Sequence, residues 1–406
     1  MMSNKTEIIH PVPDNEMERI ISLSELDLDY SNLSDLLKDL TLLAAKVSGT
    51  DISLVNLIDS FTQWTVSNHG IDLDQMTREE SACQYTIMGE DHFEVLDLSE
   101  DQRFRDNFYV KDPISLRYYF GVPLKDQAGH NLGALCVLDT KTKVLTPEKI
   151  ELLKIIAGEI VNRLRAFQAI ARLKSDVKDA NESKKKVAHD IRGPLAGIIG
   201  LSQIIAEQGK DANLDEVMDF IKLIHRSSQS VLDLADEILT EETTVKVLTE
   251  NEFNLLVFAE KLHKLYDPQA INKGVILDID IVKNVEYIPF SKNKLLQIAG
   301  NLLSNAIKFT PRNGRIHIVL DIIVQSHQNV LSIKVSDSGQ GMSQKVIDQV
   351  LTGSMGSTEG TSGEKGYGFG LSLVKHLVEK LGGSIHISSE MDAGTVFHVL
   401  VPQRNN

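Results

Sequence analysis

The chain has 406 residues, of which 42% are hydrophobic and 24% are charged, so it is long enough for two or three ordinary globular domains. Its formal net charge is −15 and no basic segment stands out, which argues against nucleic acid as a direct partner. Cys83 and Cys136 are far apart in sequence and indicate neither a disulfide framework nor a zinc site. No apolar run reaches about 18 residues, the length of a membrane span. We therefore expect a cytoplasmic, reduced protein without a membrane span.

The first segment, residues 1–25, is polar and contains two prolines, so we expect a loose lead-in. Apolar residues then repeat at helical spacing over 33–47, until a Ser-Gly pair ends the pattern. A short helix is expected near 83–88, and the segments that read as strands are 51–59, 61–67, 93–98 and both arms of the hairpin 118–138. A new helix begins near 146, where Thr, Pro and Glu give an N-cap followed by proline at the first helical position. Strands flanked by helices predict one α+β domain.

Three segments in this order, DLSEDQRF, LRYYFGVPL and GHNLGALCVLD, resemble the GAF family of sensor domains over residues 26–166. The resemblance implies a domain that holds a small-molecule ligand, such as a cyclic nucleotide or a tetrapyrrole, or that pairs with a second copy. A covalently attached bilin in related domains needs a cysteine followed by a histidine, whereas Cys83 is followed by Gln84. We expect Cys83 and Cys136 to be buried packing residues, and Trp64 to lie in the core or an interface, with a pocket-lining role as the alternative.

The helical pattern that begins near 146 continues into the stretch 184–195, KKKVAHDIRGPL. Apolar or pairing positions alternate three and four apart from Ile170 to Ile205, which predicts a heptad seam packed against partner helices. His189 lies off this seam, so we expect its ring to face solvent, where a plain surface histidine is the alternative interpretation. Pro194 lacks an N–H group, so the helix should bend just beyond the histidine.

A second helix is predicted after the turn at 208–213, with the same spacing of apolar residues from Val217 to Ile238. Two such helices cannot bury both seams by themselves. Pairing with a second copy would give a four-helix bundle, so the pattern predicts a homodimer. The unbroken helix before this hairpin is a stiff connection that can pass on a rotation or a register change.

The last segment reads as an α/β domain. Helices are expected at 253–266, 291–309 and 369–381, and strands at 275–282, 315–324, 330–336, 384–389 and 395–401. On the second of these helices Asn301, Asn305 and Lys308 follow each other at spacings of four and three, away from the apolar face. Asparagine is a poor interior helix former. This stripe suits a magnesium ion and phosphates, and a plain polar face is the alternative.

A carboxylate and several glycines follow. The strand that ends at Asp337 runs into Gly339 and Gly341, where glycine lets a ligand approach and the carboxylate can accept a bond from an exocyclic amine such as adenine N6; a simple turn is the alternative. The segment 351–363 is rich in Gly, Ser and Thr and should be mobile. Three further glycines open a helix whose first N–H groups can bind phosphate: Gly366, Gly368 and Gly370. Gly394 and Thr395 lead the final strand.

Five motifs in sequence order, HDIRGPL, NLLSNAIKFT, DSGQGM, GEKGYGFGLSL and AGTVF, closely resemble the H, N, D and glycine boxes of the sensor histidine kinases. The resemblance implies a multidomain chain. After the α+β sensor domain come a signalling helix with a dimerisation and histidine phosphotransfer domain at 167–245, which forms a dimeric four-helix bundle, and an α/β ATP-binding domain of the Bergerat type at 250–403.

The resemblance also implies roles for individual residues. His189 would be the phosphoacceptor and Asp190 its acid/base partner, Asn305 the magnesium ligand, and Asn301 and Lys308 its neighbours at the phosphates. Asp337 would hold the adenine. The residues that would shape the pocket and its lid are Gly339, Gly341, Gly366, Gly368, Gly370 and Thr395.

The function expected from this resemblance is an ATP-dependent protein-histidine kinase with ATP and Mg²⁺ as cofactors. The phosphohistidine would pass its phosphoryl group to an aspartate in the receiver domain of a separate response regulator, under control of the GAF domain. Two alternatives stay open: an ATP-binding regulatory or scaffold protein, and an ATPase of the same fold in which His189 takes no part. Gly193 occupies the place where members that also dephosphorylate their regulator usually have Thr or Asn.

Overall fold

The computed structural model describes residues 11–30, 33–208, 218, 221–226, 228–229, 252–292, 294–325, 328–352, 360–361 and 368–403. From 172 onward, many side chains of the long helix lie outside this description although its backbone is included. The segment Ile170–Asn251 forms a unit separate from the rest of the chain.

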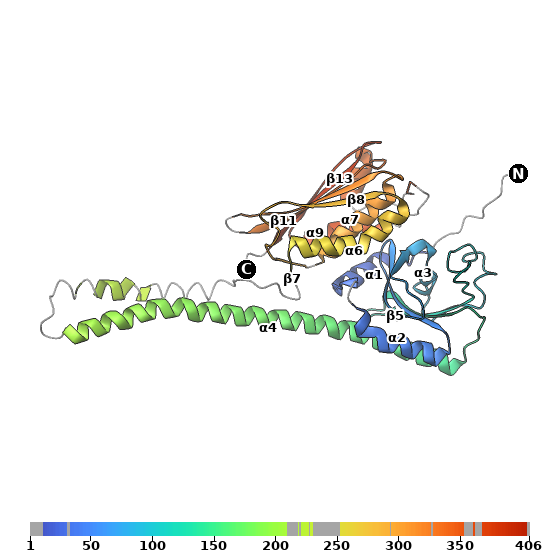
Figure 1. Ribbon diagram of the computed structural model, residues 1–406, viewed down its shortest axis with the longest axis horizontal. Helices are drawn as coiled ribbons and strands as arrows, with labels where there is room; N and C mark the ends of the chain where they lie inside the picture. The colour runs from blue at the N-terminus through green and yellow to red at the C-terminus, as the bar shows by residue number, and fades with distance from the viewer. Residues whose placement is uncertain are drawn as a thin grey trace. The chain divides into compact units, whose positions relative to one another are not determined.

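The domain that resembles the GAF family, termed the sensor domain, contains one antiparallel sheet (Figure 1). Its six strands have the order β3-β2-β1-β6-β5-β4. Its strands are β1 Ile52–Ile58, β2 Thr62–His69, β3 Gln75–Thr77, β4 Phe93–Val95, β5 Tyr118–Lys125 and β6 Asn131–Asp139. Its helices are α1 Glu16–Glu25, α2 Ser34–Ser48 and the single turn α3 Cys83–Thr86, with a 3-10 turn at Arg78–Glu80. The predicted hairpin is confirmed, since β5 and β6 pair along their whole length.

The two faces of this sheet carry separate apolar clusters, because successive side chains of a strand point to opposite faces. Val55, Leu57 and Val137 pack on α2 and the start of the long helix α4. Leu54 and Cys136, one residue away on the same strands, face α3 and the loop around Phe104. Trp64 is 3% exposed, so the prediction of a core position is confirmed, as is the burial of both cysteines.

The expected loose lead-in is wrong for its second half, because Glu16–Glu25 forms helix α1. Ile20 and Leu23 of this helix are 1% exposed and belong to the apolar core. Glu16 and Arg19 are fully buried as well. The polar composition of this segment hid the helix, since its charged residues serve as internal partners.

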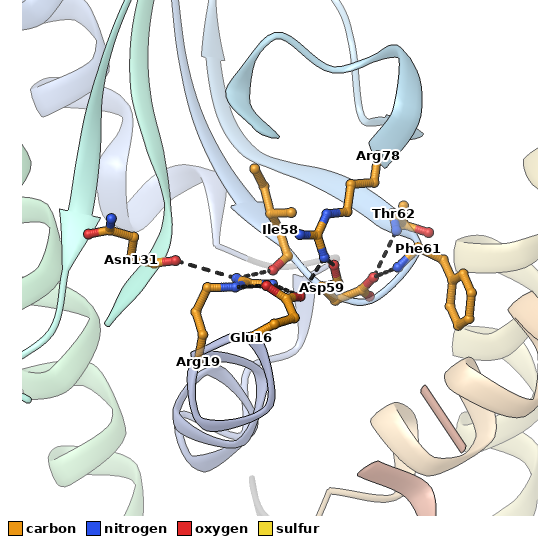
Figure 2. A network of polar contacts seen from close by, with 8 residues as sticks. All are labelled: Glu16, Arg19, Ile58, Asp59, Phe61, Thr62, Arg78 and Asn131. Atoms are coloured by element: carbon orange, nitrogen blue, oxygen red, sulfur yellow. Dashed lines mark hydrogen bonds and ion pairs between the residues drawn. The ribbon is translucent and has the colours of Figure 1, made fainter. Parts of the chain in front are cut away.

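Figure 2 shows the network that holds α1 to the sheet. The Glu16 carboxylate accepts two hydrogen bonds of 2.8 Å from Arg19 and one of 2.5 Å from Arg78. Arg19 also donates to the carbonyl of Ile58 at 2.6 Å, and Arg78 donates to the carbonyl of Asp59 at 3.1 Å. Burial by itself raises the pKa of Glu16, but the bonds and charges of the two arginines outweigh it and lower that pKa. Buried charges persist only where such partners compensate their loss of water.

Helix α4 runs unbroken over 62 residues, Pro147–Gln208. Thr146 caps it as predicted, since its hydroxyl accepts from the Lys149 N–H at 3.4 Å. The helical backbone passes through Pro194. Beyond the sensor domain, Ile170, Leu173 and Val177 are 54%, 62% and 59% exposed in the single chain, as expected of a seam that needs a partner helix. Of the predicted second helix the structure describes mainly 221–226, which are helical; the remainder lies outside the described residues.

The last domain is a two-layer α/β sandwich. Its five-stranded sheet has the order β12-β13-β11-β10-β8, with β8 and β10 parallel and the other neighbours antiparallel. The strands of the sheet are β8 Ile276–Ile281, β10 Arg315–Ile323, β11 Asn329–Asp337, β12 Ser384–Glu390 and β13 Gly394–Gln403. The helices are α6 Leu255–Lys273, α7 Leu295–Phe309, α8 Gln344–Thr352 and α9 Phe369–Lys380, and a small ribbon pairs β7 Glu252–Phe253 with β9 Phe290–Ser291.

Helices α6, α7 and α9 cover one face of this sheet (Figure 1). Alternate residues of β10, such as Ile318 and Leu320, are fully buried in the core that Leu302 of α7 and Val374 of α9 complete. The predicted helices and strands are confirmed, with three differences. Helix α7, expected from 291, begins at Leu295, because Ser291 belongs to β9. Helix α6 continues past Pro268 to Gly274, whose φ of +74° ends it, and helix α8 follows the carboxylate turn where no helix was expected.

Candidate functional site

The polar stripe of α7 is buried. Asn301, Asn305 and Lys308 are each 6% exposed, although the helix also places a continuous apolar face on the sheet. The Asn301 amide donates to the carbonyl of Gln297 at 2.9 Å, while its Oδ1 has no hydrogen-bond partner among the described residues, and neither does Nδ2 of Asn305. A buried polar atom left without a partner costs about 1–3 kcal/mol. Two such atoms one helical turn apart indicate a place prepared for a ligand or ordered water, and disfavour the plain polar face.

The end of α7 is tied to Thr361, near the end of the segment 351–363 that is rich in Gly, Ser and Thr. The Lys308 carbonyl accepts from the N–H and the hydroxyl of Thr361, both at 3.2 Å, and from the Lys273 ammonium at 3.2 Å. The Lys308 ammonium lies 4.8 Å from the ring centre of Phe309. Thr310 is fully buried, and its hydroxyl is another polar atom without a partner in the described chain.

Asp337 is held at the end of β11 by two backbone N–H groups. Its Oδ1 accepts from Gly339 at 2.8 Å and from Thr395 at 3.3 Å. Burial raises the pKa of this carboxyl above its usual value, although both N–H bonds act to lower it. Because both bonds end on Oδ1, the second oxygen is the one placed to accept from a ligand amine.

Two glycines of the predicted pocket are required by close backbone packing. Gly341 has φ +67°, and a Cβ there would lie 1.9 Å from the carbonyl oxygen of Glu390. Gly394 has φ +99°, and a Cβ there would lie 1.9 Å from the carbonyl oxygen of Asp337. Both positions let the β12–β13 turn close on the end of β11, which places Thr395 beside the carboxylate. A side chain at either would displace the Asp337 clamp.

The first turn of α9 meets the polar stripe of α7. Gly368, with φ +79°, is the residue before the helix, and a Cβ on Gly370 would lie 3.0 Å from Oδ1 of Asn301. The first N–H groups of a helix attract anions. Gly366 lies outside the described residues. The structure therefore brings together Asn301 and Gly370, and separately Asp337, Gly339 and Thr395.

Ser389 is a member of the site that the sequence did not reveal. Its hydroxyl lies 2.8 Å from that of Thr395, donates to the Gly394 carbonyl at 2.9 Å and accepts from the Met342 N–H at 2.7 Å. It thus joins the segment after Asp337 to the start of the last strand. The only signal available was its register, since Ser389 pairs with Thr395 in the sheet.

His189 and Asp190 lie within α4, whose backbone is helical at both positions, but their side chains are outside the description. The solvent-facing orientation of His189 stays a prediction. In the described part of the chain, no helix has both the length and the apolar character needed to cross a membrane.

Three family models match the chain in succession. Residues 32–164 match the GAF domain, residues 185–243 match the His Kinase A (phospho-acceptor) domain, and residues 291–405 match the histidine kinase-, DNA gyrase B- and HSP90-like ATPase. The last match contains the polar stripe of α7 and the Asp337 clamp, and implies that this domain binds ATP.

Relatives among known proteins include sensor kinases. The chain is 31% identical over 225 residues to the autoinducer 2 sensor kinase/phosphatase LuxQ of Vibrio vulnificus, covering 53% of this chain and 26% of that protein. It is 32% identical over 262 residues to the sensor-like histidine kinase R01002 of Rhizobium meliloti, covering 60% and 49%. The chain thus spans about a quarter of the length of LuxQ. Among solved structures it is similar to the histidine kinase ThkA in complex with the response regulator protein TrrA, with 20% identity, a TM-score of 0.31 and coverage of 70% of this chain and 75% of that one.

Proposed function

We propose that this chain, which belongs to the GAF-containing sensor histidine kinases, transfers the γ-phosphoryl group of ATP to His189. The observation that carries the proposal is the pair of buried, unpartnered amide atoms on α7, in a domain that matches the ATPase family model. Buried polar atoms without partners cost free energy of folding, and a polar ligand that bonds to them offsets this cost.

The adenine end of ATP is assigned to Asp337. Its free oxygen would accept from the exocyclic N6 amine, while Gly339 and Thr395 keep the carboxyl group in position. The phosphates would lie between the α7 stripe and the first turn of α9, where Lys308 and the helix N–H groups offset their charge. Gly341, Gly366, Gly368 and Gly370 would shape the pocket and its lid.

The residues also fit a magnesium ion. Amide and phosphate oxygens are the hard ligands that Mg²⁺ takes, and Oδ1 of Asn301 has no protein partner in the described chain. The resemblance to the histidine kinases assigns the direct contact to Asn305 and places Asn301 beside it, whereas the oxygen without a partner in the described residues belongs to Asn301. When bound, the ion neutralises charge on the transferring phosphoryl group.

His189 would attack the γ-phosphorus through a neutral ring nitrogen. The N–P bond forms as the bond to the β,γ-bridging oxygen breaks, and ADP leaves. Asp190, the next residue, would accept a bond from the other ring nitrogen, fix the tautomer and take up the proton. The exposed apolar stripe of α4 supports a homodimeric bundle.

The phosphoryl group would pass next to an aspartate in the receiver domain of a separate response regulator. The GAF domain would regulate these steps through α4, and a small-molecule ligand of that domain is part of the proposal. A cytoplasmic setting would supply ATP and Mg²⁺. The domain limits expected from the sequence, 167–245 and 250–403, are kept as proposals, and the first domain, expected at 26–166, is extended to include helix α1, Glu16–Glu25.

The test is to incubate the chain with γ-labelled ATP and Mg²⁺ and to follow acid-labile, alkali-stable label on the protein. We expect His189→Gln and Asn305→Ala to abolish the label. His225→Gln, a change at an exposed histidine of the same unit, should keep it. Label that persists in His189→Gln would refute the assignment. ATP binding or hydrolysis without any phosphohistidine would favour the scaffold or the ATPase alternative.

A further inference from the structure

A small cavity lies inside the sensor domain, between the sheet and the layer that contains α3. Its volume is about 40 Å³, and its walls include Asn56, Cys83, Tyr119 and Cys136. Binding pockets for drug-sized ligands occupy about 300–1,000 Å³, whereas a single water needs about 10–15 Å³ of this kind of volume. The cavity therefore suits a molecule of a few atoms and is too small for a cyclic nucleotide or a tetrapyrrole.

The two cysteines of the chain meet at this cavity although 53 positions separate them. Cys83 comes from α3 and Cys136 from β6, and their sulfur atoms are 3.7 Å apart. The Asn56 amide donates to both sulfurs at 3.2 Å, and the Tyr119 hydroxyl donates to the Cys83 sulfur at 3.3 Å. A disulfide needs a sulfur–sulfur distance of about 2.0 Å. The two sulfurs must therefore approach by less than 2 Å for a bond to form.

The surroundings make the two thiols unequal. Burial by itself raises the pKa of Cys83, but hydrogen bonds from Cys136, Tyr119 and Asn56 stabilise the thiolate and lower that pKa to about 7. For Cys136, burial and the neighbouring Cys83 raise the pKa well above its usual value. A thiolate beside a protonated thiol is the arrangement in which one sulfur attacks an oxidant and the other resolves the product.

Part of the cavity wall lies at the protein surface, although both cysteines are buried. Phe108, in the cavity wall, is 44% exposed, and Ile71 and Leu73 of the wall are half-buried. The partly exposed side of the cavity wall is therefore apolar, and such side chains admit a small uncharged molecule more readily than an ion. The oxygen of Asn56, buried and without a partner in the described chain, lies among the lining residues.

We propose that Cys83 and Cys136 form a peroxide-sensing pair that closes to an intramolecular disulfide. The Cys83 thiolate attacks one oxygen of hydrogen peroxide, the O–O bond breaks, and the leaving hydroxide takes a proton to become water. The resulting Cys83 sulfenic acid is attacked by the Cys136 sulfur; the S–S bond forms, and the hydroxyl group leaves with the Cys136 proton as a second water. The two sulfurs lose two electrons in total, and peroxide gains them.

The test uses the full chain, in which these are the only cysteines. The reduced protein is treated with an equimolar amount of hydrogen peroxide, and its free thiols are then alkylated and counted by intact mass. We expect two alkylated thiols before treatment and none after it, with the loss of two hydrogens and a Cys83–Cys136 cross-linked peptide. Two thiols that remain alkylatable, or a cross-link between two chains, would overturn the proposal.

Single variants separate the two roles. In Cys136→Ser, Cys83 should stop at the sulfenic acid, which a dimedone probe captures; Cys83→Ser should give no dimedone product, because the Cys136 thiol stays protonated. Asn56→Ala removes the donor that both sulfurs share, so the pKa of Cys83 should rise and less thiolate should be present. The rate of oxidation near neutral pH should then fall roughly fivefold. Thermal melting shows whether each variant is folded. Equal dimedone labelling of both single-cysteine variants would contradict the assignment, whether or not the kinase activity proposed above exists.

Discussion

Two buried polar sites of this molecule differ in whether their carboxylate or amide atoms all have hydrogen-bond partners within the protein. In the sensor domain, both carboxylate oxygens of Glu16 accept hydrogen bonds from arginines. On α7, Asn301 and Asn305 are buried almost as deeply, yet each keeps a polar atom without a partner in the described chain. A buried carboxylate whose two oxygens are both bonded from within the protein stabilises the fold, whereas a buried amide that keeps an unbonded atom points to a ligand. Three predictions test this comparison, beginning with the largest effect.

Glu16→Gln should destabilise the sensor domain by about 3 kcal/mol, because it leaves two buried arginines without their carboxylate. Thermal or denaturant unfolding followed on the sensor domain measures the change. The exposed Glu18→Gln on the same helix is the matched control and should be nearly neutral. ATP affinity should not change in either variant. A neutral Glu16→Gln would mean that the network contributes nothing to stability.

Asp337→Asn should weaken ATP binding by about tenfold to a hundredfold, the equivalent of roughly 1.5–3 kcal/mol for a hydrogen bond to a charged group. Its effect on folding should be small, because the amide oxygen can still accept from Gly339 and Thr395. Calorimetric titration with ATP gives the affinity. Asp392→Asn, an exposed aspartate in the adjacent turn, should bind ATP as the unmodified chain does. Unchanged affinity in Asp337→Asn would remove Asp337 from the site.

The smallest effect is a pair of opposite pH dependences. The pKa of Glu16 is lowered in the folded chain, so its contribution to stability is present above the unfolded value of 4.5 and is lost as pH falls below it. The pKa of Asp337 is raised, so this carboxyl costs stability as pH rises from its unfolded value of 3.8 through the folded one.

Unfolding measured between about pH 3 and pH 7 should therefore show the Glu16→Gln deficit shrinking towards acid. Over the same range the free energy of unfolding of Asp337→Asn, relative to that of the unmodified chain, should increase as pH rises. If the stabilities of the two variants, each relative to the unmodified chain, changed with pH in parallel, the pKa values of Glu16 and Asp337 would not be shifted in opposite directions.

The sequence predicted the α7 stripe because helical periodicity converts spacings of three and four directly into a shared face. Asp337 and its glycines were equally accessible, since they adjoin each other in the chain. The Glu16 network and the Cys83–Cys136 contact could not be found in this way. Both join residues more than 50 positions apart, and their proximity depends on how strands of the sheet are ordered. Ser389 was missed for a different reason: it is near Thr395 in sequence, but only the register of β12 against β13 brings the two hydroxyl groups together.

Helix α4 is uninterrupted. The number of residues between the sensor domain and His189 therefore determines the position of His189 around the helix axis. One residue inserted after Ala169 would turn everything that follows by about 100° about the helix axis. Seven inserted residues would return the histidine to within about 20° of its original azimuth. Substitutions along this rod leave the azimuth unchanged, so the length of the segment, more than its composition, determines which side of the helix presents the histidine.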